Sequence, residues 1–126
     1  MNDPCECGPC TYTLEDITAL GRRLVACKGF RPMRGMLDLQ GRTWDTSLLW
    51  RWNNDVDVPD LRDPATLGCV LALVREAWDD VEAYVMPWHD EDGGYTVCLP
   101  DDDGTRLVSE GDTEAEALVA ALESAP

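Results

Sequence analysis

The residues best suited to binding chemistry are arginines and tryptophans that gather in one stretch of the chain. The candidate ligand-binding residues are Arg31, Arg34, Arg42, Trp44, Arg51 and Trp52. A guanidinium group grips phosphate through two parallel hydrogen bonds, and an indole ring stacks on a base or supports an arginine. The pattern predicts a site for a small anionic, nucleotide-like ligand. The alternative is that Trp50 and Trp52 anchor the core while the arginines cover them or pair with acids.

Three cysteines near the start of the chain have a spacing that suits a metal ion. Cys5, Cys7 and Cys10 form a C-x-C-x-x-C pattern, in which two or three thiolates can meet one Zn²⁺. A fourth ligand would have to come from another cysteine or from His89, the single histidine. Because no second matched pair follows, residues 1–12 are interpreted first as a flexible arm with reduced thiols, and zinc is the alternative.

The sequence contains no motif of a known catalytic class. It has neither a glycine-rich phosphate loop ending in Lys-Ser or Lys-Thr nor a strand-linked G-x-G-x-x-G. Its carboxylates gather in turn sequences, whereas a pair of catalytic acids needs an enclosed pocket. We therefore expect a binding protein without enzymatic activity, and no cofactor apart from the zinc alternative.

Charge is spread very unevenly along the chain, which has a net charge of −15 over 126 residues. Seven of the ten lysines and arginines lie within residues 22–51, whereas residues 55–126 carry three arginines and 19 acids. Such a surface repels duplex nucleic acid and suits the basic groove of a protein that normally holds it. The second binding hypothesis is therefore an acidic protein inhibitor, similar in kind to an anti-CRISPR protein, that blocks a host nucleic-acid-binding complex. The alternative is that the acids serve solubility.

Length and composition predict one globular domain over residues 13–126, since 126 residues suit a single core and 44% of them are hydrophobic. No apolar run approaches the length of a membrane span, and no signal peptide opens the chain. We therefore expect a cytoplasmic protein without membrane contact. The sequence leaves both a monomer and a homo-oligomer as alternatives.

The hydrophobic pattern predicts an α+β fold with three helices. The expected helices cover residues 14–28, 63–78 and 113–123, and Thr13, Asp63 and Thr113 are their expected N-caps. The middle helix is apolar on most sides and is expected at the centre of the core. About five strands are expected, at residues 36–39, 42–45, 83–88, 94–99 and 105–109, and residues 48–52 are expected to continue as an extended piece. The order α-β-β-α-β-β-β-α then predicts an antiparallel sheet layered with helices, an α/β/α sandwich.

Several short motifs occur in an order that resembles the phage ABA-sandwich family, small proteins of tailed phages with an α/β/α layered fold. They are Val25-Ala26-Cys27-Lys28-Gly29-Phe30, a loop with Trp44, Trp50 and Trp52, Ala77-Trp78, Tyr95-Thr96-Val97, and the segment 111–122 that begins Gly-Asp-Thr-Glu-Ala-Glu. The resemblance spans about Thr13 to Ala125 and leaves out the cysteine arm and the acidic insert 53–60.

This resemblance implies a viral accessory protein with no settled catalytic residues. Such a protein would counter host defence in the host cytoplasm, either as a sponge for a nucleotide signal or as an acidic inhibitor. A resemblance of the C-terminal third to HicB-type antitoxins gives a third hypothesis.

Overall fold

The computed structural model describes residues 13–44, 57–87, 93–101 and 104–126. In chain order the elements are α1 (Leu14–Val25), α2 (Pro64–Ala77), β1 (Tyr84–Pro87), β2 (Tyr95–Asp101), β3 (Gly104–Gly111) and α3 (Glu114–Glu123). The described part of the chain is therefore an α+β fold with three helices and one three-stranded sheet in the order β1-β2-β3. The predicted arm, residues 1–12, lies outside the described residues.

All three helices begin at the predicted N-caps. The Thr13 hydroxyl accepts a hydrogen bond from the Asp16 amide at 3.1 Å, and the Asp16 carboxylate accepts one from the Thr13 amide at 3.0 Å. Asp63 caps α2 by accepting from the Thr66 amide at 2.9 Å, and Thr113 caps α3 by accepting from the Glu116 amide at 3.1 Å. Each cap satisfies an amide that has no partner inside its own helix.

The sheet is the antiparallel meander that the last three predicted strands indicate. Tyr84 pairs with Cys98 between β1 and β2, and Thr96 pairs with Glu110 between β2 and β3. The register between β2 and β3 shifts at Val97/Cys98. The Thr96 hydroxyl donates to the Ser109 carbonyl at 2.7 Å, so a buried polar side chain on the central strand is satisfied within the sheet.

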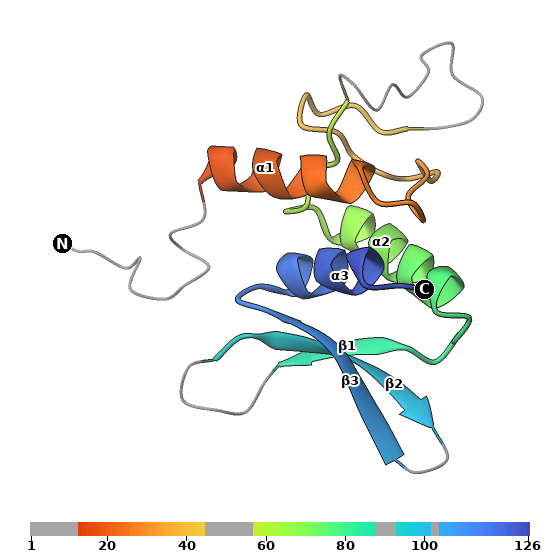
Figure 1. The fold of residues 1–126 in the computed structure, drawn as a ribbon. Helices are drawn as coiled ribbons and strands as arrows, with labels where there is room; N and C mark the ends of the chain where they lie inside the picture. The colour runs from red at the N-terminus through yellow and green to blue at the C-terminus, as the bar shows by residue number, and fades with distance from the viewer. Residues whose placement is uncertain (1–12, 45–56, 88–92, 102–103) are drawn as a thin grey trace, which may run out of the picture.

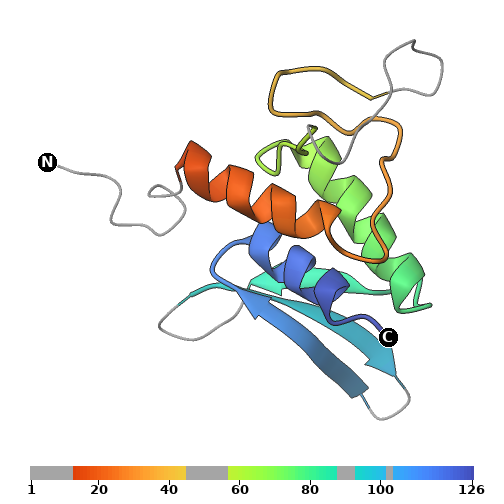
Figure 2. The same cartoon turned by 45° about the horizontal axis from the view of Figure 1, so that its top comes forward.

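The helices do not sandwich the sheet, because all three lie on the same side of it (Figures 1 and 2). Helix α3 packs directly on all three strands, and both α1 and α2 pack on α3. The predicted α/β/α arrangement is therefore wrong for the described elements, which stack as the sheet, then α3, then α1 with α2 beside them.

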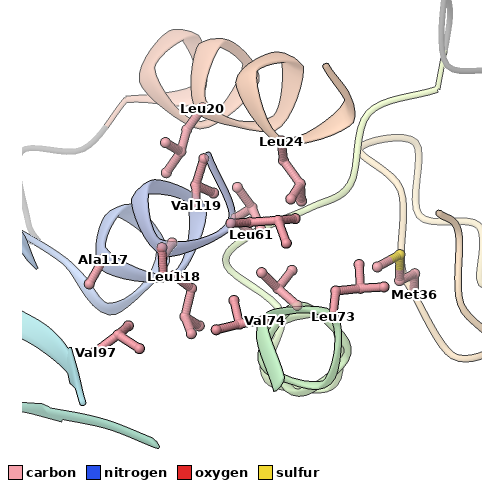
Figure 3. Packing of buried hydrophobic residues seen from close by; sticks show 14 residues of the cluster. Leu20, Leu24, Met36, Leu61, Leu73, Val74, Val97, Ala117, Leu118 and Val119 are labelled. Atoms are coloured by element: carbon pink, nitrogen blue, oxygen red, sulfur yellow. The ribbon is translucent and has the colours of Figure 1, made fainter. Parts of the chain in front are cut away.

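Helix α3, and not α2, occupies the centre of the core. Its buried residues are Ala115, Ala117, Leu118, Val119, Ala121 and Leu122. In Figure 3 the Val119 side chain lies next to Leu20 of α1, whereas Leu118 points toward Val97 of β2 and Val74 of α2. The prediction for α2 was wrong because an apolar sequence shows that a helix is buried but not how many neighbours bury it.

The predicted strands at 36–39 and 42–45 are not formed over the described residues 36–44, and the predicted extended piece 48–52 lies outside the described residues. The chain turns between the two segments, where Gly41 has φ +85°. However, the Asp38 carboxylate accepts hydrogen bonds from the Gln40 and Arg42 amides at 3.0 and 2.7 Å. This side chain closes a tight loop, and the ladder beyond it is reduced to the isolated bridge between Leu37 and Thr43. Five strands and the predicted element order are therefore not observed among the described residues.

Candidate functional site

The predicted ligand-binding residues are only partly brought together. The Gly35 amide donates to the Trp44 carbonyl at 3.0 Å, and the Trp44 amide donates to the Met36 carbonyl at 2.8 Å. These bonds place Arg34 close in space to Trp44, with Arg34 exposed and Trp44 half-buried. Arg51 and Trp52 lie outside the described residues, as does Trp50.

Arg42 is held by two buried carboxylates. Its Nε donates to Asp38 at 2.9 Å and its Nη2 donates to Asp57 at 2.7 Å. Asp38 is 2% exposed and Asp57 is 4% exposed, so both acids depend on protein donors for their hydrogen bonds. Arg42 therefore ties the loop after α1 to the segment that leads into α2.

Arg31 is bound to a carboxylate in a different part of the molecule. Its guanidinium donates to Glu76 near the end of α2, and both side chains are more than half exposed. The hydrogen bond and the charge of Glu76 raise the pKa of Arg31, and the same hydrogen bond lowers the pKa of Glu76. Arg31 and Arg42 are thus each engaged by acids, and in different places, instead of facing one common ligand.

The proposed zinc ligands Cys5, Cys7 and Cys10 lie outside the described residues, and so does His89. Within the described ranges no three histidine, cysteine or acidic side chains are grouped so as to hold a metal ion. Cys27 and Cys69 are half-buried free thiols, and Cys98 is a buried one. Burial, followed by the charge of a nearby acid, raises the pKa of the Cys27 and Cys69 thiols.

A pocket that the sequence did not predict opens where the helices begin. It has a volume of about 280 Å³ and is lined by Ile17, Leu61, Arg62, Leu67, Tyr95, Thr113, Glu114 and Ala115. These residues come from the first turns of the three helices, the segment before α2 and the first residue of β2. The helices run in the same direction, which brings their N-termini to one end of the helix layer (Figure 1).

Among the described residues, this end, here called the acidic end, carries seven acids and one base: Glu15, Asp16, Asp60, Asp63, Asp112, Glu114, Glu116 and Arg62. Each helix N-terminus contributes about half a positive charge, which offsets these acids only in part. Arg62 is bound to Asp60 through its Nε at 2.8 Å and its Nη2 at 3.0 Å. The surroundings of the pocket are therefore strongly negative.

Asp60 is the most enclosed acid of this group, with 8% of its surface exposed. Burial raises the pKa of its carboxyl, but the hydrogen bonds and charge of Arg62 lower it by more, so that the net direction is downward. The charged form of Asp60 is therefore the stable one in the folded protein, and the Asp60–Arg62 pair forms a fixed part of the rim.

A second pocket, of about 450 Å³, lies at the opposite end of the helix layer, where the helices finish. It is lined by Arg23, Ala26, Cys27, Lys28, Gly29, Ala77, Leu122, Glu123, Ala125 and Pro126. Arg23 donates to Glu123 through Nε at 3.1 Å and Nη2 at 2.7 Å, so this guanidinium is already engaged by an acid. Helix C-termini carry partial negative charge, which disfavours a bound anion here.

The chain matches no family model, and no curated protein or solved structure matches it significantly. The resemblance to the phage family and the weaker resemblance to HicB-type antitoxins therefore stay predictions. The longest described helix, α2, has 14 residues, fewer than the roughly 20 that a membrane-spanning helix needs.

The pocket at the acidic end had one indication in the sequence, namely the acids that follow or form each N-cap. Those acids could be assigned to helix starts, but the sequence could not show that the three helix starts lie side by side.

Proposed function

We propose that this chain is a binding protein without enzymatic activity, whose acidic end docks on the basic, nucleic-acid-binding surface of a partner protein. The observation that carries this proposal is that the described residues of the acidic end include seven acids and one base, at the end of the helix layer where the pocket opens. The resemblance to phage proteins extends the proposal to an inhibitor of a host defence complex in the host cytoplasm.

The acidic end supports this function better than the arginine-rich loop supports capture of a nucleotide. A guanidinium must be able to turn toward a phosphate to bind it with two hydrogen bonds. Arg31 and Arg42 already donate to carboxylates, and the two acids that hold Arg42 are buried. At the acidic end, by contrast, acids outnumber bases, so a basic partner would supply the missing positive charge.

The test is binding of a fluorescein-labelled peptide of nine lysines, measured by fluorescence anisotropy at low and physiological salt. The paired variant Glu15→Gln/Glu114→Gln removes two charges from the acidic end without touching an N-cap. The matched control Asp79→Asn/Glu82→Gln removes two exposed charges from the turn between α2 and β1. Asp79 has φ +52°, a conformation that asparagine accepts readily.

We expect the acidic-end variant to weaken binding about fivefold at low salt and the control to weaken it by less than about twofold, because surface charges act mainly on nearby partners. Equal weakening by the two variants would show that the peptide senses only net charge, and the proposal would then be wrong.

Nucleotide capture is kept as a second candidate because the structure places Arg34 beside Trp44. A thermal-shift series with cyclic and linear nucleotides tests it. Stabilisation that Arg34→Ala or Arg51→Ala abolishes would favour this candidate, and the absence of any shift would exclude it for the nucleotides used.

A further inference from the structure

We propose that the pocket at the acidic end receives one apolar side chain of the partner protein, flanked in the partner's sequence by lysines or arginines. This inference rests on the proposed function and adds the contact that would fix the register between two oppositely charged surfaces.

The walls of the pocket are mainly apolar. Ile17 comes from α1, Leu61 and Leu67 flank the start of α2, Tyr95 begins β2 and Ala115 lies in the first turn of α3. Ile17, Leu61 and Ala115 are each at most 5% exposed, so they form a fixed floor within the core. An apolar side chain of the partner that entered the pocket would itself leave water.

The pocket, with a volume of about 280 Å³, has room for one apolar side chain. A side chain that fills such a pocket acts as an anchor residue, which contributes more to binding than the contacts around it.

Apolar surface continues beyond the pocket on α1. Leu14 is 59% exposed, compared with 47% for Leu107, the other leucine with a large exposed surface among the described residues. It lies one helical turn before Ile17 on the same face of α1. A single exposed leucine needs no explanation by itself. Leu14 matters here because it joins the apolar floor to the surface that a partner would approach.

The charged residues around the pocket indicate which charge the partner's neighbouring residues should carry. Glu114, in the first turn of α3, and Arg62 are the two charged residues that line the pocket. The positive charge of Arg62 is already neutralised by its hydrogen bonds to Asp60. The neighbouring acids of the acidic end attract cations and repel anions. A partner residue that is apolar fits the apolar pocket, and basic residues beside it are attracted to the surrounding acids. Acidic residues beside it would be repelled.

The experiment compares two fluorescein-labelled peptides, each with four lysines on both sides of a central residue that is leucine in one and serine in the other. Anisotropy titrations give the ratio of their affinities for the intact chain. We expect the leucine peptide to bind about fivefold more tightly, because its side chain would leave water for the pocket.

Three variants test where this preference arises. Leu67→Phe adds volume at the pocket wall and should reduce the preference to less than about twofold. Leu14→Ser should lower it while leaving the fold intact, because Leu14 is exposed. The matched control Val81→Ser replaces a side chain that is 83% exposed and outside the pocket lining, so it should leave the preference unchanged. Circular dichroism confirms that each variant is folded.

The charge variant separates this inference from the proposed function. The charge variant used here, Glu15→Gln/Asp112→Asn, removes two exposed acids of the acidic end that lie outside the pocket lining, so it should weaken both peptides by a similar factor and leave the leucine preference in place. If both peptides bind equally to the intact chain while this variant still weakens them, the pocket proposal fails and the proposed function stands. If the variant weakens neither peptide, the proposed function itself fails.

Two other occupants would also overturn the proposal. A dimer in sedimentation velocity that Leu67→Phe dissociates would assign the pocket to a second copy of this chain. A leucine preference that appears only after residues 1–12 are deleted would assign it to the chain's own N-terminal segment.

Discussion

The two ends of the helix layer are built from the same elements but differ in how their charges are matched. The helices start together at the acidic end and finish together at the other, here called the carboxyl end. At the carboxyl end the guanidinium groups of Arg23 and Arg31 are bound to Glu123 and Glu76. At the acidic end the described residues include seven acids and one arginine. The acids there suit the positive ends of the helix dipoles, and Arg22 and Arg23 suit the end of α1, whereas α3 ends at Glu123 with no base in its last turn.

The two ends also differ in what forms them. At the acidic end, β3 passes close to the backbone of α3 at Gly111, and Asp60 is nearly buried. At the carboxyl end, Gly29 approaches the tip of the Leu122 side chain. The Cζ of Arg106 lies 5.4 Å from the centroid of the Trp78 ring, and the Trp78 Nε1 donates to the Ala121 carbonyl. The close approach at Gly111 is therefore to backbone atoms, whereas the close approach at Gly29 is to a side-chain tip that can rotate.

The largest expected change in the free energy of unfolding comes from replacing one glycine by alanine at each end. In Gly111→Ala the new Cβ would lie 2.5 Å from the Ala117 amide nitrogen and 2.8 Å from the Glu116 carbonyl carbon, so backbone must move. In Gly29→Ala the nearest atom, the Cδ1 of Leu122 at 3.2 Å, can rotate away. We expect Gly111→Ala to lower the free energy of unfolding by about 2–3 kcal/mol and Gly29→Ala by less than about 1 kcal/mol.

Urea denaturation followed by circular dichroism measures both free energies. Gly68→Ala serves as a reference, because nothing lies within 4 Å of a Cβ there and alanine favours the helix. Similar losses for Gly111→Ala and Gly29→Ala would remove the distinction between a close approach to backbone atoms and one to a side-chain tip.

A smaller effect should come from the ion pairs. In Arg62→Gln the nearly buried Asp60 loses its charged donor, whereas in Arg23→Gln the partner Glu123 keeps a side chain that is 38% exposed. At pH 7 we expect a loss of about 1 kcal/mol for Arg62→Gln and less than about 0.5 kcal/mol for Arg23→Gln.

The Arg62→Gln loss should depend on pH because the folded-state pKa of Asp60 lies below its usual value. A lowered acid pKa stabilises the fold above the unfolded pKa of about 3.9, and that stability disappears as the pH falls through the folded value. Denaturation at pH 7 and at pH 3 should therefore show the gap between intact chain and variant narrowing in acid. A gap that is constant with pH would mean that Asp60 is not its source.

The smallest effect concerns the two half-buried thiols, one from each end. Glu123 contributes to the raised pKa of Cys27, and Asp63 contributes to that of Cys69, in each case after burial. Glu123→Gln should lower the pKa of Cys27 and speed its alkylation by iodoacetamide at pH 7.5 by about two- to threefold, because the thiolate is the reacting form. Peptide mass spectrometry gives the rate at each cysteine. An equal increase at Cys69 would point to loosening of the whole fold.

Local features of this protein were predictable because their causes lie within a few residues. Thr13, Asp63 and Thr113 cap their helices as expected, since each side chain binds an amide three residues later. Strands β1, β2 and β3 form close to where they were expected, because alternating side chains separated by turn sequences are typical of a meander. Residues 36–44 were mispredicted as two strands because the Asp38 carboxylate accepts hydrogen bonds from the Gln40 and Arg42 amides and closes a tight loop.

The sequence by itself determined where the helices start, the meander of β1, β2 and β3, and how much negative charge the chain carries. The tertiary structure alone decided that the helix starts converge and that α3 lies at the centre of the core. It also decided that Arg31 binds Glu76 while Arg42 binds Asp38 and Asp57. The physical reason is distance along the chain: Ile17, Leu61 and Ala115 line one pocket, and contacts across such separations depend on how whole elements pack.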